Sequence, residues 1–201
     1  MNPLARHYAR FRVAERILLT GHSHQAWPDE AFEAQQRAWL DAAEYVDDKW
    51  GRAAARAEEV REGYARLLGD TAANIALGQN THELLTRWLS ALPLRERRRL
   101  VTTDAEFHSV RRQLDRLAED GLLDIVRVPA RPVDTLTQRL GAAVDDRTAC
   151  AIVSSVLYDT AEIVPDLDVI ARACATAGAE LLVDAYHHLN VVPFDVSSMG
   201  L

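Results

Sequence analysis

The residues best suited to chemistry lie in one stretch near the end of the chain, Glu180 to His188. Four mostly apolar positions, typical of a buried strand, lead directly into Asp184, and His187 follows three residues later. Open α/β sheets place ligand chemistry at the carboxyl ends of their strands. A carboxylate there can ion-pair with a protonated ring nitrogen, the partner that the pyridinium of pyridoxal 5'-phosphate (PLP) needs. The alternative is that Asp184 caps the next turn and the two histidines belong to a loop.

Three further segments carry polar or aromatic residues just after a predicted strand. Thr81 is a candidate helix N-cap, and free backbone N–H groups at Thr81 and His82 could hold a phosphate. Phe107 could lie on a planar ring, and Tyr158 adds a phenol near the end of a later strand. Each has a simpler interpretation, such as an ordinary capped helix or a core aromatic residue. Their shared place at one edge of a sheet nevertheless favours a binding site.

The elements that must position these residues alternate between strand and helix from residue 71 onward. Strands are predicted at 74–77, 100–103, 124–128, 149–154 and 181–184, and helices at 81–92, 109–120, 135–144 and 167–177. Such alternation predicts an α/β fold with a mainly parallel sheet covered by helices on both faces, a three-layer αβα arrangement. We therefore expect residues 71–201 to be part of one large α/β domain.

The first 70 residues follow a different pattern. A short strand is predicted at 16–20, followed by helices at 31–46 and 53–68 that Gly51 separates. Both helices have mostly polar outer faces. We therefore expect residues 1–70 to form a helical N-terminal arm that lies against the main domain or a partner subunit.

Composition narrows the class of protein. The chain has 201 residues, 48% of them hydrophobic, which is enough for a substantial core. A net charge of -7 argues against a nucleic-acid binder, and no apolar run approaches the length of a membrane span. Cys150 and Cys174 stand in apolar settings that suit buried thiols in a reducing compartment. We expect a cytoplasmic protein that binds neither nucleic acid nor membrane.

The order of these segments resembles the fold-type I PLP enzymes of the class V aminotransferase group, and it is most similar to kynureninase. Asp184-Ala-Tyr-His187 resembles the family's Asp-x-x-His motif, in which the Asp meets the pyridine nitrogen. Phe107 stands where kynureninases place a ring-stacking Phe, whereas cysteine desulfurases of the same group use His there and usually carry Gln in place of His187. Thr81 and His82 fall where the family binds the cofactor phosphate. Tyr158 falls in a segment that resembles the one near phosphate and substrate.

This resemblance implies PLP as the cofactor, a small amino-acid substrate and a homodimer that builds its site between two subunits. It implies hydrolytic Cβ–Cγ cleavage of a kynurenine-type substrate, with Asp184 and His187 as catalytic residues. The family also holds PLP through a Schiff-base lysine some tens of residues past the Asp motif. This chain has 22 arginines and one lysine, Lys49, which we expect to pair with its acidic neighbours. We therefore expect the N-terminal part of a longer enzyme, lacking its C-terminal part.

Three alternatives stay open on the sequence. The first keeps PLP but makes the reaction transamination, or desulfuration as in cysteine desulfurases. The second is a zinc-dependent hydrolase that uses His22 and His24 with His187, His188 or Asp184 as ligands. The third is a non-catalytic, truncated paralogue that only pairs with a partner through its helical arm.

Overall fold

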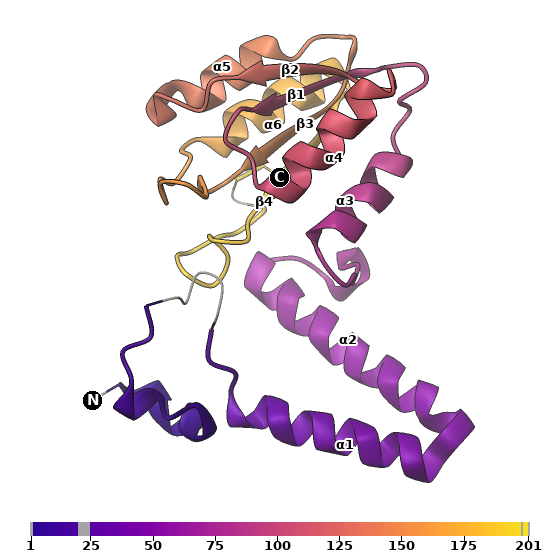
Figure 1. Ribbon diagram of the computed structural model, residues 1–201. Coiled ribbons are helices and arrows are strands. Elements are labelled where there is room, and N and C mark those ends of the chain that lie inside the picture. The colour runs from indigo at the N-terminus through magenta and orange to yellow at the C-terminus, as the bar shows by residue number, and fades with distance from the viewer. Residues whose placement is uncertain (1, 20–24, 198, 201) are drawn as a thin grey trace. The chain divides into compact units, whose positions relative to one another are not determined.

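The computed structural model describes residues 2–19, 25–197 and 199–200 (Figure 1). The chain divides into two compact units, residues 1–60 and residues 61–201. All the strands that the described residues form lie in the second unit, and the first is helical. The arm predicted for residues 1–70 stays a prediction.

The first unit contains short 3-10 helices and two long α-helices. In chain order these elements are η1 (Pro3–Phe11), η2 (Val13–Glu15), α1 (Asp29–Tyr45), η3 (Val46–Asp48) and α2 (Lys49–Leu68), which continues into the second unit. The predicted pair of long helices is confirmed, but the predicted break at Gly51 is wrong because Gly51 lies inside α2. The break falls at Val46, whose φ of 41° cannot continue a right-handed helix. An interior glycine costs only about 1 kcal/mol relative to alanine, which the rest of a long helix offsets.

Two predicted strands do not form. Residues 16–19 make no strand, and Ile17 and Leu19 are 88% and 82% exposed, while Thr20 lies outside the described residues. Residues 75–77 are also without a strand and follow the 3-10 helix η4 (Ala72–Asn74). A strand requires a neighbouring strand for its backbone N–H and C=O groups, and no described segment pairs with either stretch.

The second unit is built on a parallel sheet. Its elements are α3 (Thr81–Ser90), β1 (Arg99–Thr103), α4 (His108–Glu119), β2 (Asp124–Val128), η5 (Val133–Thr135), α5 (Leu136–Ala143), β3 (Thr148–Ser154), α6 (Leu167–Ala177) and β4 (Glu180–Asp184). The strand order is β2-β1-β3-β4, and each neighbouring pair is parallel. The predicted αβα fold is confirmed, and the predicted strand and helix bounds agree within a residue or two.

Helices lie on both faces of the sheet (Figure 1), and alternating residues along the strands build a separate core on each face. Leu100 and Ile152 pack on one face with apolar side chains of α3 and α4. Val101 and Val153 pack on the other face with residues of α5 and α6. Every residue of β3 is buried, as expected for a central parallel strand covered on both sides. The rigid sheet therefore presents the carboxyl ends of its strands along one edge.

Candidate functional site

The carboxyl ends of β3 and β4 bring polar residues from distant parts of the sequence together. In the parallel register, Ser154 is the partner of Asp184, so the last residues of the two strands lie side by side. The backbone N–H of Ser155 donates to the carbonyl oxygen of Asp184 at 2.9 Å, and its hydroxyl donates to the same oxygen at 3.2 Å. The register therefore fixes the backbone of Asp184 at the sheet edge.

The Asp184 side chain is half-buried and only partly engaged. Its Oδ1 accepts the backbone N–H of Tyr186 at 3.0 Å. Its Oδ2 accepts no hydrogen bond from any residue that the structure describes. The carboxylate is therefore held at Oδ1, while Oδ2 is open in the sense that no described group donates to it, and it could accept a hydrogen bond from a protonated ring nitrogen.

Glu106 is a buried carboxyl group at the same edge, and no role for it was predicted from the sequence. Its Oε1 accepts from the Thr103 hydroxyl at 2.6 Å, and its Oε2 accepts from the Ser154 hydroxyl at 2.7 Å. Burial raises the pKa of Glu106, the hydrogen bonds oppose that shift, and the negative charge of Asp184 adds to it. The spacing from Thr103 at the end of a predicted strand was the only signal in the sequence.

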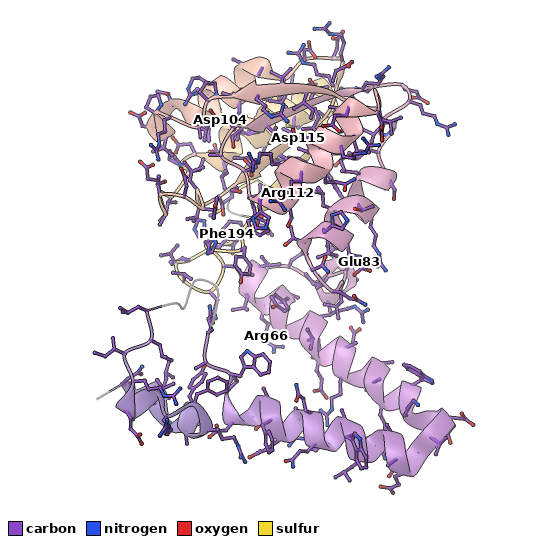
Figure 2. The ribbon with its side chains drawn as sticks, in the orientation of Figure 1. Arg66, Glu83, Asp104, Arg112, Asp115 and Phe194 are labelled. Atoms are coloured by element: carbon purple, nitrogen blue, oxygen red, sulfur yellow. The ribbon has the colours of Figure 1, made fainter. Side chains whose placement is uncertain are left out.

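Phe107 and Tyr158, both predicted site residues, are in contact. Their ring centroids are 6.1 Å apart and the rings meet edge to face at 76°. Tyr158 also lines a cavity of about 470 Å³, together with Glu106, His108 and Arg111. Figure 2 labels Asp104, another residue of this cavity, and Arg112 and Asp115 on the adjoining helix α4. Tyr158 therefore joins the edge of the Phe107 ring to a hollow that it lines itself.

Helix α3 begins close to the prediction, but its N-cap is Asn80 and not Thr81. The Asn80 side chain accepts the backbone N–H of Glu83 at 3.0 Å, and the Glu83 carboxylate accepts the N–H of Gln79 at 2.7 Å. Asparagine caps helices better than threonine, which explains the difference. Within the described chain, the N–H groups of Thr81 and His82 have no acceptor. These two groups are the ones predicted to hold a phosphate.

The two adjacent histidines after β4 have different environments. His187 is half-buried, with its ring edge against Tyr186 at a centroid distance of 4.8 Å. His188 is 5% exposed and packs on Phe194, also at 4.8 Å. Burial lowers the pKa of His188, which favours the neutral form of the ring. His187 is therefore the more accessible of the pair.

The residues at the strand ends and at the start of α3 are of the types that bind PLP. The cofactor needs a carboxylate for its ring nitrogen, an aromatic face and backbone N–H groups for its phosphate. Asp184, Phe107 and the start of α3 supply one of each, with the open Oδ2 of Asp184 as the most specific observation. Lys49 belongs to the first unit, where its Nζ lies 5.4 Å from the centroid of the Trp50 ring.

The two cysteines cannot act as surface nucleophiles. Cys150 and Cys174 are 0% and 2% exposed. Burial raises the pKa of Cys150 to about 12 and that of Cys174 to about 11, and in both the charge of Glu180 contributes. The reactive thiolate is therefore scarce at neutral pH.

We expect neither thiol to react with a water-soluble disulfide reagent at pH 8 while the protein is folded. Both should react once guanidinium unfolds the chain. Counting the thiolate released with and without denaturant checks this, and rapid modification of one cysteine in the folded protein would contradict the buried placement.

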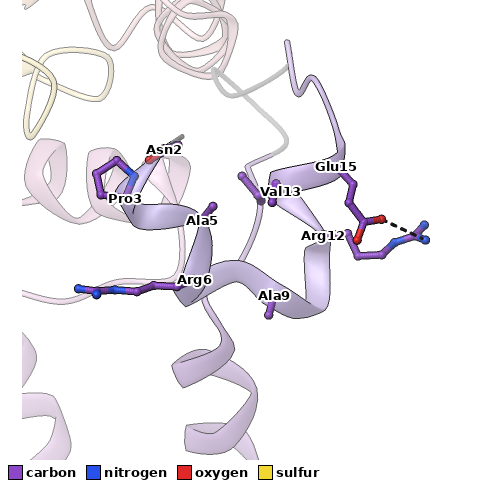
Figure 3. A pocket seen from close by; sticks show the side chains of 9 residues that line it. Asn2, Pro3, Ala5, Arg6, Ala9, Arg12, Val13 and Glu15 are labelled. Atoms are coloured by element: carbon purple, nitrogen blue, oxygen red, sulfur yellow. Dashed lines mark ion pairs between the residues drawn. The ribbon is translucent and has the colours of Figure 1, made fainter.

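The described residues also form hollows away from the strand ends, the larger of about 910 Å³ between α1 and α2. A hollow of about 490 Å³ in the first unit is lined by nine residues between Asn2 and Glu15, and its Arg12–Glu15 ion pair of 3.9 Å is exposed (Figure 3). No cluster of three metal-binding side chains occurs in the described chain, and His22 and His24 lie outside it. None of the described helices has the length and apolar character to cross a membrane.

The sequence matches the family described as aminotransferase class-V over residues 40–201. A search of curated proteins gave no match. The fold matches the αβα fold of the fold-type I PLP-dependent enzymes. The chain belongs to the class-V aminotransferase family.

Solved structures with the same fold are about twice as long as this chain. A mutant of C-DES with glycine covalently linked to its PLP cofactor has a TM-score of 0.85 at 17% identity, covering 100% of this chain and 54% of that one. Cysteine desulfurase from Thermococcus onnurineus NA1 has a TM-score of 0.75 at 18% identity, covering 98% of this chain and 50% of that one. Cysteine desulfurase CsdA from Escherichia coli has a TM-score of 0.72 at 20% identity, covering 96% of this chain and 52% of that one. At these identities the likeness establishes the fold.

Proposed function

We propose that this chain forms the PLP-binding part of an enzyme that acts on a small amino acid. The observation that carries the proposal is the half-engaged carboxylate of Asp184 at the end of β4, beside the polar end of β3. Membership of a family of PLP-dependent enzymes supports it. Bound PLP supplies an electron sink for negative charge that develops on the substrate carbon.

Each proposed residue has a defined task. Asp184 keeps a proton on the ring nitrogen through its open Oδ2, and the N–H groups of Thr81 and His82 bind phosphate oxygens. Phe107 covers the ring, and Tyr158 supports Phe107 through their edge contact. His187, the half-buried neighbour of the buried His188, lies in the turn that directly follows Asp184, and we assign it the task of holding or moving a proton there.

For the substrate we propose a sulfur amino acid whose C–S bond is cleaved. This is the desulfurase alternative of the sequence analysis, and the names of the structural neighbours support it. Kynurenine-type hydrolysis is the second candidate, because Phe107 stands at the position where the resemblance implies a stacking Phe in kynureninases. The buried thiols Cys150 and Cys174 offer no sulfur acceptor within the described chain.

The cofactor test should not depend on a lysine. Pyridoxamine 5'-phosphate and phosphopyridoxyl amino acids, made by borohydride reduction of PLP with an amino acid, bind without forming a covalent bond to protein. One neighbour supports this design, since the C-DES mutant described above holds a PLP–glycine adduct.

We expect the chain to bind pyridoxamine 5'-phosphate and to bind the phosphopyridoxyl adduct of cysteine about tenfold more tightly than that of kynurenine, a difference of about 1.4 kcal/mol. Fluorescence titration measures each affinity. The opposite order would favour kynurenine-type hydrolysis, and no binding of any of these probes would overturn the proposal.

We also propose that the protein is a cytoplasmic homodimer, as the family resemblance implies. Exposed tryptophans on α1 and α2 support a partner surface, since Trp39 and Trp50 are 72% and 71% exposed. Light scattering coupled to gel filtration tests this, and a mass near the 22.4 kDa of one chain would contradict it.

A further inference from the structure

Glu106 joins two strand ends that are far apart in the sequence. It lies in the loop between β1 and α4 and is 4% exposed. Besides its bonds to the Thr103 and Ser154 hydroxyls, its Oε1 accepts the backbone N–H of Ser154 at 3.3 Å. One buried side chain therefore ties the loop after β1 to the end of β3, 48 residues away in sequence.

The same loop carries Phe107. The Thr103 hydroxyl that donates to Glu106 also accepts the backbone N–H of Ala105 at 3.2 Å, so the loop is tied internally as well. Phe107 follows Glu106 directly and is the N-cap residue of α4 without a side-chain cap of its own. The position of the Phe107 backbone therefore depends on the Glu106 hydrogen bonds.

Ser154 connects this network to Asp184. It is the register partner of Asp184 in the β3–β4 ladder, and the Asp184 charge acts on Glu106. We infer that Glu106 is a positioning residue, which holds the Phe107 ring in a fixed place relative to the ends of β3 and β4. This inference rests on the proposed function, because Phe107 and Asp184 are the proposed cofactor contacts.

Glu106 positions Phe107 through its hydrogen bonds and not through a negative charge. Burial and the charge of Asp184 both raise the pKa of Glu106, which favours the neutral carboxyl. Glutamine has the same shape as a neutral carboxyl group. Its oxygen can accept from Thr103 and the Ser154 N–H, while its amide donates to the Ser154 hydroxyl, which can donate or accept.

The first experiment needs no cofactor. The protein is labelled with 4-fluorophenylalanine, and the 19F resonance of Phe107 is assigned by its loss in Phe107→Leu. In Glu106→Ala we expect this resonance to shift or broaden while those of the other three phenylalanines stay in place. In Glu106→Gln all four should keep their positions, and the exposed control Glu119→Ala should also change nothing.

The second experiment measures affinity for pyridoxamine 5'-phosphate. We expect Glu106→Ala to weaken binding about tenfold and Glu106→Gln to stay within about twofold, because alanine removes the buried hydrogen bonds and the amide restores them. Rescue by the amide separates positioning from an effect of charge. Circular dichroism and thermal unfolding confirm that each variant is folded.

The inference is overturned if the Phe107 resonance is unchanged in Glu106→Ala, or if Glu106→Gln disturbs it equally. If Glu106→Ala does not fold, Ser154→Ala removes one donor to the same carboxyl and should still move the Phe107 resonance. An unmoved resonance in that variant would also overturn it. Absence of pyridoxamine 5'-phosphate binding in the wild-type protein would count against the proposed function alone, since the fluorine experiment decides the positioning role by itself.

Discussion

Replacing Asp184 by Asn is expected to weaken binding of pyridoxamine 5'-phosphate by about 30- to 100-fold. The substitution keeps an oxygen that can accept the Tyr186 N–H at 3.0 Å, so the turn after β4 should survive. It removes the negative charge that would face the protonated ring nitrogen. A hydrogen bond to a charged group is worth about 1.5–3 kcal/mol, which is roughly 13- to 160-fold in affinity, and the expected loss lies in the middle of that range.

Asp168→Asn is the matched control for this prediction. Asp168 lies in the first turn of α6 and forms an exposed ion pair with Arg172, so its neutralisation changes the net charge equally. The Asp168→Asn protein should bind pyridoxamine 5'-phosphate with the wild-type affinity. An Asp184→Asn protein that binds within threefold of wild type would show that this carboxylate does not hold the ring nitrogen.

Replacing Ile152 by Ala should lower the free energy of unfolding by about 2–5 kcal/mol. Ile152 is fully buried at the centre of β3 and packs on the face that α3 and α4 cover. The smaller side chain leaves a cavity that the tightly packed neighbours fill only in part. Urea unfolding followed by circular dichroism measures the change.

Ile152→Val provides the graded control, with an expected loss of about 0.5–1.5 kcal/mol because only one methylene is removed. An alanine variant as stable as the valine variant would mean that this face of the sheet is loosely packed. The arrangement of the strand ends would then be less rigid than the proposed site requires.

Much of the second unit could be predicted from the sequence because its signals are local. Short segments with two to five apolar residues, bounded by polar ones, identify β1 to β4, and helical spacing identifies α4 and α6. Asp184 could be placed at a strand end for the same reason, since it directly follows Leu181 to Val183. Residues 16–19 and 75–77 carry similar apolar patterns but find no partner strand, and a pattern alone cannot supply one.

What the sequence determined by itself is the alternation of elements, the αβα class and the position of Asp184, because each depends on neighbouring residues. Only the tertiary structure decided that Glu106 is buried against Ser154, that Phe107 meets Tyr158, and that Ser154 flanks Asp184. These contacts join residues dozens of positions apart. They depend on strand order and register, which are set by how the whole sheet packs against its helices.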